Sequence, residues 1–150
     1  MKIRNVVVAA LAALTASAAF AQAKPEDQIR LRQGGLQLLA KNVGALAAVA
    51  KGDVPFNKEA VNARGEYINF LAQDITGSGF GAGSDKSLPT RANPKIWSDG
   101  EGFKAAAGKL TAATAKLATV ADLNALKAAV TELQGACKNC HDNYRDSSYH

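Results

Sequence analysis

Apolar residues in the C-terminal part of the chain recur at helical spacing. Their steps alternate between three and four residues along one stretch, which contains Leu123, Leu126, Val130, Leu133, Cys137, Cys140 and Tyr144. A period of 3.6 residues places such positions on one face of an α-helix. The pattern therefore predicts a helix that ends near Arg145 and carries two cysteines on its buried face.

Three earlier segments show the same period. The first begins near Pro25 and ends near Gly52, the second follows a capping residue at Asn57, and the third follows a capping pattern of Ser98 and Glu101. The positions predicted to face inward are Ile29, Leu36, Leu39, Ala40, Val43, Leu46, Ala47 and Ala50 in the first, Val61, Arg64, Ile68, Leu71 and Ile75 in the second, and Phe103, Ala106, Leu110, Ala113 and Leu117 in the third. No segment alternates apolar and polar residues as a strand does. The sequence predicts an all-α fold, an antiparallel four-helix bundle.

The helical period does not decide where two aromatic side chains of the second helix and one long loop pack. Tyr67 and Phe70 widen the apolar face of the second helix, and we expect them in the core rather than on a surface shared with another subunit. Residues 76–96 are rich in glycine and form the one long loop. Such a loop either covers a functional site or is an exposed connection. If it covers a site, Phe80 is the side chain that would do so.

The first residues have the pattern of a secretory signal. Lys2 and Arg4 precede the apolar run 6–14, and residues 19–21 form an A-x-A cleavage site. The run is too short to span a bilayer. We predict a signal peptide over residues 1–21 and one domain over residues 22–150, exported to the periplasm with no membrane segment after cleavage.

Cleavage changes both the charge and the set of available ligands. The whole chain carries a formal net charge of +5, and loss of Lys2 and Arg4 would leave +3. This charge, without any run of basic residues, does not suggest nucleic-acid binding. Cleavage would also remove Met1, the only methionine of the chain.

The segment Cys137-Lys138-Asn139-Cys140-His141 carries the most specific chemistry. C-x-x-C-H is the attachment sequence for a c-type haem: each thiol adds to a haem vinyl group, and the adjoining imidazole binds the iron. The cofactor we predict is one haem c per chain, covalently held by Cys137 and Cys140, with His141 as the metal ligand.

Three other interpretations of the two cysteines are weaker. A thioredoxin-like site needs a preceding strand, and none is predicted. A zinc site needs four ligands, but the exported chain offers only the two cysteines, His141 and the terminal His150, at poor spacing. A disulfide would close a very small loop and leave His141 unexplained.

Arg32 and Gln33 interrupt the apolar face of the first helix one turn before Leu36. A buried charge needs a partner, so Arg32 either reaches the surface, meets a carboxylate, or meets a haem propionate. In the presence of a haem motif we favour the propionate, with Leu36 covering the iron face opposite His141.

The sequence resembles the cytochrome c prime family, the high-spin class II c-type cytochromes. The similar segments are residues 24–27, Arg32-Gln33-x-x-Leu36, residues 96–99 with 103–104, and Cys137-x-x-Cys140-His141-x-x-Tyr144-Arg145. The resemblance implies a C-terminal haem in a four-helix bundle that is usually a homodimer through the first two helices. It also implies a five-coordinate iron bound by His141, a distal side blocked by Leu36, and Arg145 near the proximal face. Residues 77–79 depart from the bulkier, aromatic segment of some relatives.

The available ligands favour a function in gas binding. Without methionine the His/Met pair of electron-transfer cytochromes c cannot form, and His150 ends the same helix as His141. Lysine is a less favoured alternative ligand, so we expect the sixth iron position to be open. An apolar Leu36 over that position suits nitric oxide and carbon monoxide better than oxygen.

The alternative function is a one-electron carrier with a redox partner in a periplasmic respiratory or denitrification chain. We expect no enzyme, because no acid or base is found near Leu36 in the sequence.

Overall fold

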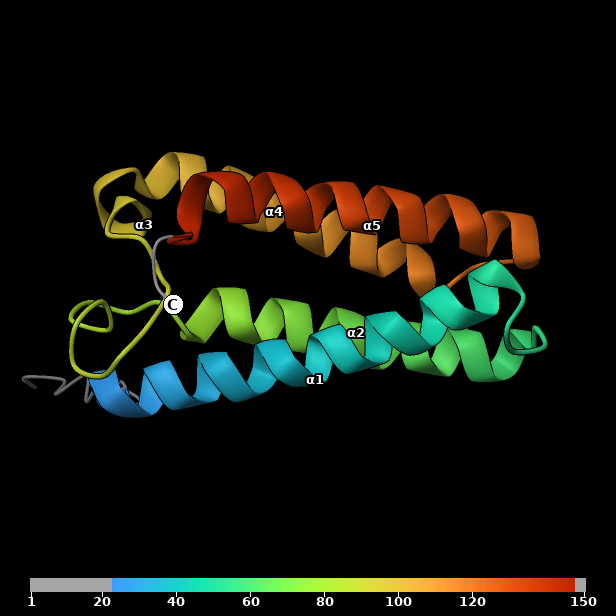
Figure 1. Ribbon diagram of the computed structural model, residues 1–150, viewed down its shortest axis with the longest axis horizontal. Helices are drawn as coiled ribbons and strands as arrows, with labels where there is room; N and C mark the ends of the chain where they lie inside the picture. Colours follow the sequence, from blue (N-terminus) through green and yellow to red (C-terminus); the bar gives the residue numbers. More distant parts are fainter. Residues whose placement is uncertain (1–22, 148–150) are drawn as a thin grey trace, which may run out of the picture.

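Four long helices form an antiparallel bundle in the computed structural model, which describes residues 23–147 (Figure 1). The elements are α1 (Pro25–Lys51), α2 (Lys58–Ser78), the short α3 (Lys95–Ser98), α4 (Gly100–Leu117) and α5 (Leu123–Tyr144). The predicted fold class is therefore confirmed. The predicted signal peptide, residues 1–21, and His150 lie outside the described residues. None of the helices within residues 23–147 is both long and apolar enough to cross a membrane.

The helices begin and end where local chemistry favours it. Pro25 occupies the first turn of α1, where its missing N–H costs nothing. Gly52 ends that helix at φ 91°, a left-handed conformation that favours glycine. Asn57 caps α2, since its side-chain oxygen accepts a hydrogen bond of 2.8 Å from the backbone N–H of Ala60.

The predicted cap of α4 is wrong by one residue. Ser98 is the last residue of α3, so its backbone is already helical. Asp99 has the non-helical backbone that a cap requires, and its carboxylate accepts a hydrogen bond of 3.2 Å from the N–H of Gly102. The short α3 is the element that sequence periodicity did not reveal.

Most of the predicted inward positions are buried in the bundle core. Those that are buried are Ile29, Leu39, Leu46, Ala50, Val61, Ile68, Leu71, Ile75, Ala106, Leu110, Ala113, Leu117, Leu126, Val130, Leu133 and Tyr144. Leu36 and Val43 are partly buried against this core, whereas Ala40 and Arg64 are exposed. The core prediction is confirmed for each of the four long helices.

Tyr67 and Phe70 are not in the core, contrary to expectation. Their exposed fractions are 43% and 63%. Each residue turns about 100° from the one before it. Ile68, Leu71 and Ile75 already fill the inward side of α2, so the two rings point away from the neighbouring helices.

Each long helix contacts two others, which fixes the order around the bundle. α1 lies between α2 and α5, and α4 also lies between α2 and α5. In Figure 1, α1 and α2 form one layer and α4 and α5 the other. The seam between α1 and α5 is therefore opposite the seam between α2 and α4.

The loop between α2 and α3 closes one end of the bundle (Figure 1). It is shorter than predicted, because α2 continues through Ser78. The loop meets the end of α5, where Ala92 and Arg145 form an isolated antiparallel bridge. The N–H of Asn93 donates to the carbonyl of Tyr144 at 3.0 Å. The loop therefore lies beside the residues that follow the cysteine motif.

Gly65 sets the closest approach of α2 to α4. A Cβ built at this position would meet the backbone carbonyl of Leu117. Because a backbone carbonyl cannot swing aside as a side chain can, any larger residue would force the two helices apart. At Gly108 in α4 the same construction meets nothing within 4 Å.

We expect Gly65→Ala to lower the free energy of unfolding by about 1–3 kcal/mol, through the strain of overpacking. Gly108→Ala is the matched control: it should raise the free energy of unfolding by about 0.5–1 kcal/mol, because alanine favours the helix. Urea unfolding of both variants measures these changes. An unchanged or higher midpoint in Gly65→Ala would contradict the proposed close approach.

Candidate functional site

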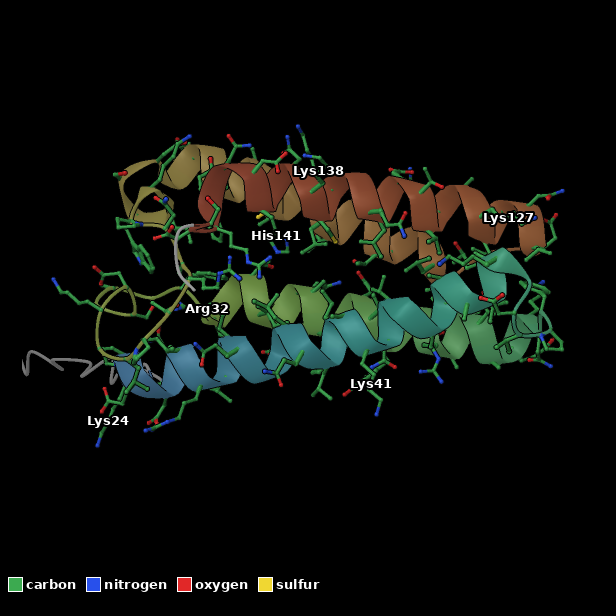
Figure 2. All side chains as sticks on the ribbon, viewed as in Figure 1. Lys24, Arg32, Lys41, Lys127, Lys138 and His141 are labelled. Atoms are coloured by element: carbon green, nitrogen blue, oxygen red, sulfur yellow. The ribbon has the colours of Figure 1, made fainter. Side chains whose placement is uncertain are left out.

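One face of α5 presents the residues of the cysteine motif. Cys137 and Cys140 are both half-buried and carry free thiols. His141, four residues after Cys137, lies on the side of α5 that faces α1 and α2, whereas Lys138 lies on the outer side (Figure 2). Helical spacing alone brings two thiols and an imidazole together.

This face borders a large cavity inside the bundle. The cavity has a volume of about 980 Å³ and is lined by residues of α1, α2, α4, α5 and the long loop. Its exposed lining residues belong to α1 and α5, among them Gln33 and Gln37 on one side and His141 and Arg145 on the other. The cavity therefore opens to solvent along the seam between α1 and α5.

All eight predicted site residues line this one cavity: Cys137, Cys140, His141, Arg32, Gln33, Leu36, Phe80 and Arg145. They come from α1, the loop, α5 and the residue that follows α5, and up to 113 positions separate them in sequence. The structure brings them together as the sequence analysis expected. Contact of each with a haem stays a prediction.

The environment favours the neutral forms of the attachment residues. Although His141 is exposed at the cavity mouth, partial burial lowers the pKa of its imidazole, the charge of Arg145 lowers this pKa further, Asp142 raises it by less, and Arg91 adds the smallest lowering effect. A neutral imidazole has a free nitrogen lone pair for a metal. Burial also raises the pKa of the Cys137 and Cys140 thiols, so both are protonated at neutral pH.

These residues fit a covalently attached haem. The cavity is lined largely by apolar side chains, which suits a flat macrocycle, and the two thiols and the imidazole stand together at its mouth. Basic side chains at the same cavity, Arg32, Arg91 and Arg145, suit carboxylates. When bound, the haem would be held by Cys137, Cys140 and His141, and it would supply an iron able to bind a small ligand.

Arg32 is buried and connects α1 to the loop. Its side chain is 2% exposed, so it does not reach the surface. One terminal nitrogen donates to the carbonyl of Gly79 at 2.8 Å and to the hydroxyl of Ser84 at 3.2 Å. The other donates to the carbonyl of Ser84 at 2.9 Å and to the hydroxyl of Thr90 at 2.8 Å. Burial lowers the pKa of this guanidinium, and the Phe80 ring lies 4.8 Å from it.

The partners of Arg32 differ from those weighed in the sequence. They are carbonyl and hydroxyl oxygens of the loop rather than a carboxylate side chain. Sequence reasoning missed Ser84 and Thr90. The only signal for them was that a buried arginine needs acceptors and that the long loop contains hydroxyl residues.

Other side chains hold the same loop. Gln28 accepts from the N–H of Gly81 at 2.7 Å, and Gln33 donates to the carbonyl of Pro89 at 3.0 Å. Trp97 donates from its indole nitrogen to the carbonyls of Phe80 and Gly81, each at 3.1 Å. These bonds hold Phe80 against the cavity, so the interpretation of the loop as a cover is favoured over an exposed connection.

Three aromatic rings form one wall of the cavity. Phe80 and Phe103 meet edge to face with centroids 4.8 Å apart, and Phe103 and Tyr144 do so at 5.4 Å. The hydroxyl of Tyr144 donates to Asp99 at 2.9 Å. The helical periods of the sequence predict inward positions for Phe103 and Tyr144, but neither these two residues nor Arg91 was predicted as a site residue.

Comparison with known proteins gives one consistent result. A family model described as Cytochrome C′ matches residues 27–145. A cytochrome c′ of Rubrivivax gelatinosus is 40% identical over 126 residues, which cover 82% of this chain and 97% of the relative. A cytochrome c′ of Alcaligenes xylosoxydans xylosoxydans is 35% identical over 126 residues, with 82% and 96% covered.

Solved structures agree with the sequence relatives. The crystal structure of cytochrome c′ from Rubrivivax gelatinosus has a TM-score of 0.78 and 40% identity, covering 83% of this chain and 98% of that one. A nitric oxide complex of a leucine-to-isoleucine mutant of cytochrome c prime from Alcaligenes xylosoxidans has a TM-score of 0.76 and 34% identity, with 83% and 98% covered.

We expect Arg32→Met to lower the free energy of unfolding by about 3 kcal/mol, because several buried acceptors of the loop lose their donor. Limited proteolysis should also cut within residues 79–94 faster. Arg30→Met is the matched control: Arg30 is exposed and makes only a 3.4 Å ion pair with Asp27, so its loss should change stability by less than about 0.5 kcal/mol. Equal cleavage of the loop in both variants would show that Arg32 does not hold it.

Proposed function

The chain belongs to the cytochrome c′ family, whose members carry covalent haem c and are not enzymes, and on this premise we propose that it binds small diatomic gases, chiefly nitric oxide and carbon monoxide. The observation that carries the proposal is the largely apolar lining of the cavity. Leu36, Leu39, Val43, Ala72 and Ile75 all belong to it, and none of these side chains offers a hydrogen bond. A bound ligand would meet an apolar surface.

The described lining also lacks the usual second axial ligands of a haem iron. Within the part of the chain that the structure describes, the cavity lining contains no methionine, no lysine and no histidine besides His141. An iron bound by His141 would keep one position for an external ligand. Three solved structures of cytochrome c prime mutants from Alcaligenes xylosoxidans are nitric oxide complexes, which supports the choice of ligand.

Each predicted site residue has a proposed role. Cys137 and Cys140 would form the thioether bonds to one haem, and His141 would bind its iron. Arg32 and Gln33 would bind the propionates at the end of the cavity near the loop.

The remaining roles concern access to the iron. Phe80 would cover a haem edge, and Leu36 would restrict the distal side. Arg145 would lie near the proximal face, where its charge already acts on the pKa of His141.

Electron transfer with a periplasmic redox partner is the alternative function. It is supported by the position of His141 at the cavity mouth, which would bring a haem attached there close to solvent. Export to the periplasm rests on the signal pattern of residues 1–21. Rates of electron exchange with a partner, compared with rates of gas binding, separate the two functions.

We also propose a homodimer through α1 and α2. Four large apolar side chains are exposed on these two adjacent helices: Leu31 and Leu38 on α1, at 65% and 46%, and Tyr67 and Phe70 on α2. Contiguous exposed apolar surface is typical of interfaces, and we propose that these four side chains form one such surface. The outward orientation of Tyr67 and Phe70 therefore favours a surface shared with another subunit. On the sequence alone, this was the less favoured alternative to a place in the core.

Absorption spectra of the ferric and ferrous protein, with and without carbon monoxide, test the gas-binding proposal. The colour should stay on the protein after acid-acetone extraction, and carbon monoxide should shift the ferrous spectrum. A protein that takes up no carbon monoxide would contradict the proposal.

We expect Leu36→Ala to raise the carbon monoxide association rate by about tenfold, a barrier change of about 1.4 kcal/mol, because it removes the bulk over the ligand position. Leu38→Ala, on the outer side of the same helix, should leave the rate unchanged. Stopped-flow mixing measures both. Equal rates in wild type and Leu36→Ala would remove Leu36 from the ligand path.

We expect Phe70→Glu to raise the dimer dissociation constant about a hundredfold or more, because it buries a charge at the proposed interface. Ala128→Glu adds the same charge on the exposed side of α5 and should leave association unchanged. Sedimentation analysis measures both. A wild-type protein that sediments as a monomer would contradict the dimer.

A further inference from the structure

A second hollow lies on the opposite side of the bundle from the cavity mouth. It is a groove of about 360 Å³ between α2 and α4, lined by Gln73, Thr76 and Gly77 of α2 and by five residues of α4 between Phe103 and Thr111. Nothing in the function proposed above uses this groove.

The groove and the haem cavity share a wall. Thr76, Phe103 and Ala107 line both hollows. Only one layer of side chains therefore separates solvent at the groove from the interior of the cavity. Two of the three are small, and the third is a ring that is only half-buried.

Two glycines keep the groove open from outside. A Cβ built at Gly77 or at Gly108 meets nothing within 4 Å, and neither residue has a positive φ. The backbone therefore does not require glycine at either position. The same pair of helices is in tight contact at Gly65, so the seam is closed at one end and hollow at the other.

The cavity mouth is the side that an attached cofactor would occupy. Cys137, Cys140 and His141 lie on α5, beside the opening between α1 and α5. A group tethered to these residues would be held on that side, whereas the wall that the cavity shares with the groove belongs to α2 and α4. Ile75 and Leu110 of the same two helices also line the cavity, and both are apolar.

We propose that the groove between α2 and α4 is a side entrance to the cavity for small uncharged diatomic molecules, with Phe103 as its movable partition. The inference rests on the gas-binding function proposed above. Phe103 packs edge to face with Phe80 and Tyr144 and is only half-buried, and rotation of its ring would open the wall between Thr76 and Ala107. Such rotations are fast compared with ligand mixing. Ions are disfavoured, because Thr76, Phe103 and Ala107 offer no charge to replace their hydration.

The test is Gly108→Leu, which fills the groove from outside without touching the cavity. Filling the groove raises the free-energy barrier to passage equally in both directions. The carbon monoxide association and dissociation rates should therefore fall by the same factor, at least about threefold, and the dissociation constant should be unchanged. Phe103→Val should raise both rates together. Gly135→Leu is the matched control, since a Cβ at this helical glycine also meets nothing within 4 Å and the residue lines neither hollow. Its rates should equal those of wild type.

Two outcomes overturn the proposal: unchanged rates in Gly108→Leu, or a changed dissociation constant, which indicates a disturbed cavity. Crystals of the haem-bound protein under xenon pressure give a readout that does not depend on gas binding to iron. Xenon should occupy the groove and the cavity beside Phe103 in wild type, and the groove should be empty in Gly108→Leu. Failure of wild type to bind carbon monoxide would defeat the gas-binding function alone, and xenon absent from both hollows would defeat the entrance.

Discussion

One helical face of α5 has to carry two thiols and an imidazole and still face a space rather than another helix. Protein interiors are normally close-packed, so a bundle with a cavity of about 980 Å³ lacks the contacts that would otherwise stabilise it. A covalently attached group supplies those contacts. The cofactor of this family is therefore part of the core, and the helices around it are arranged to surround it rather than to touch one another.

The loop between α2 and α3 depends on the same arrangement. It has no regular structure of its own, and Arg32 holds it through four hydrogen bonds to Gly79, Ser84 and Thr90. A buried cation is costly without compensation, and here carbonyl and hydroxyl dipoles provide it. One side chain thus fixes the loop and places a positive charge on the wall of the cavity.

The α2–α4 seam shows how small residues can serve opposite purposes in one helix pair. At Gly65 the absence of a side chain lets backbones approach, whereas at Gly77 and Gly108 it leaves open space. The first glycine fixes the distance between the helices at one end. The other two leave only Thr76, Phe103 and Ala107 between solvent and the cavity. Ligand access and bundle stability are therefore controlled by different parts of the same interface.

The sequence by itself determined the features that depend on neighbours along the chain. The 3–4 spacing from Leu123 to Tyr144, the cap at Asn57 and the C-x-x-C-H chemistry are local, because a helical period and a covalent spacing involve residues within a few turns. Tertiary structure decided the rest. Whether Tyr67 and Phe70 are buried depends on which faces of α2 meet another helix, and the acceptors of Arg32 lie 47 to 58 residues away. Burial and long-range hydrogen bonds depend on the relative placement of helices, which periodicity within one helix does not encode.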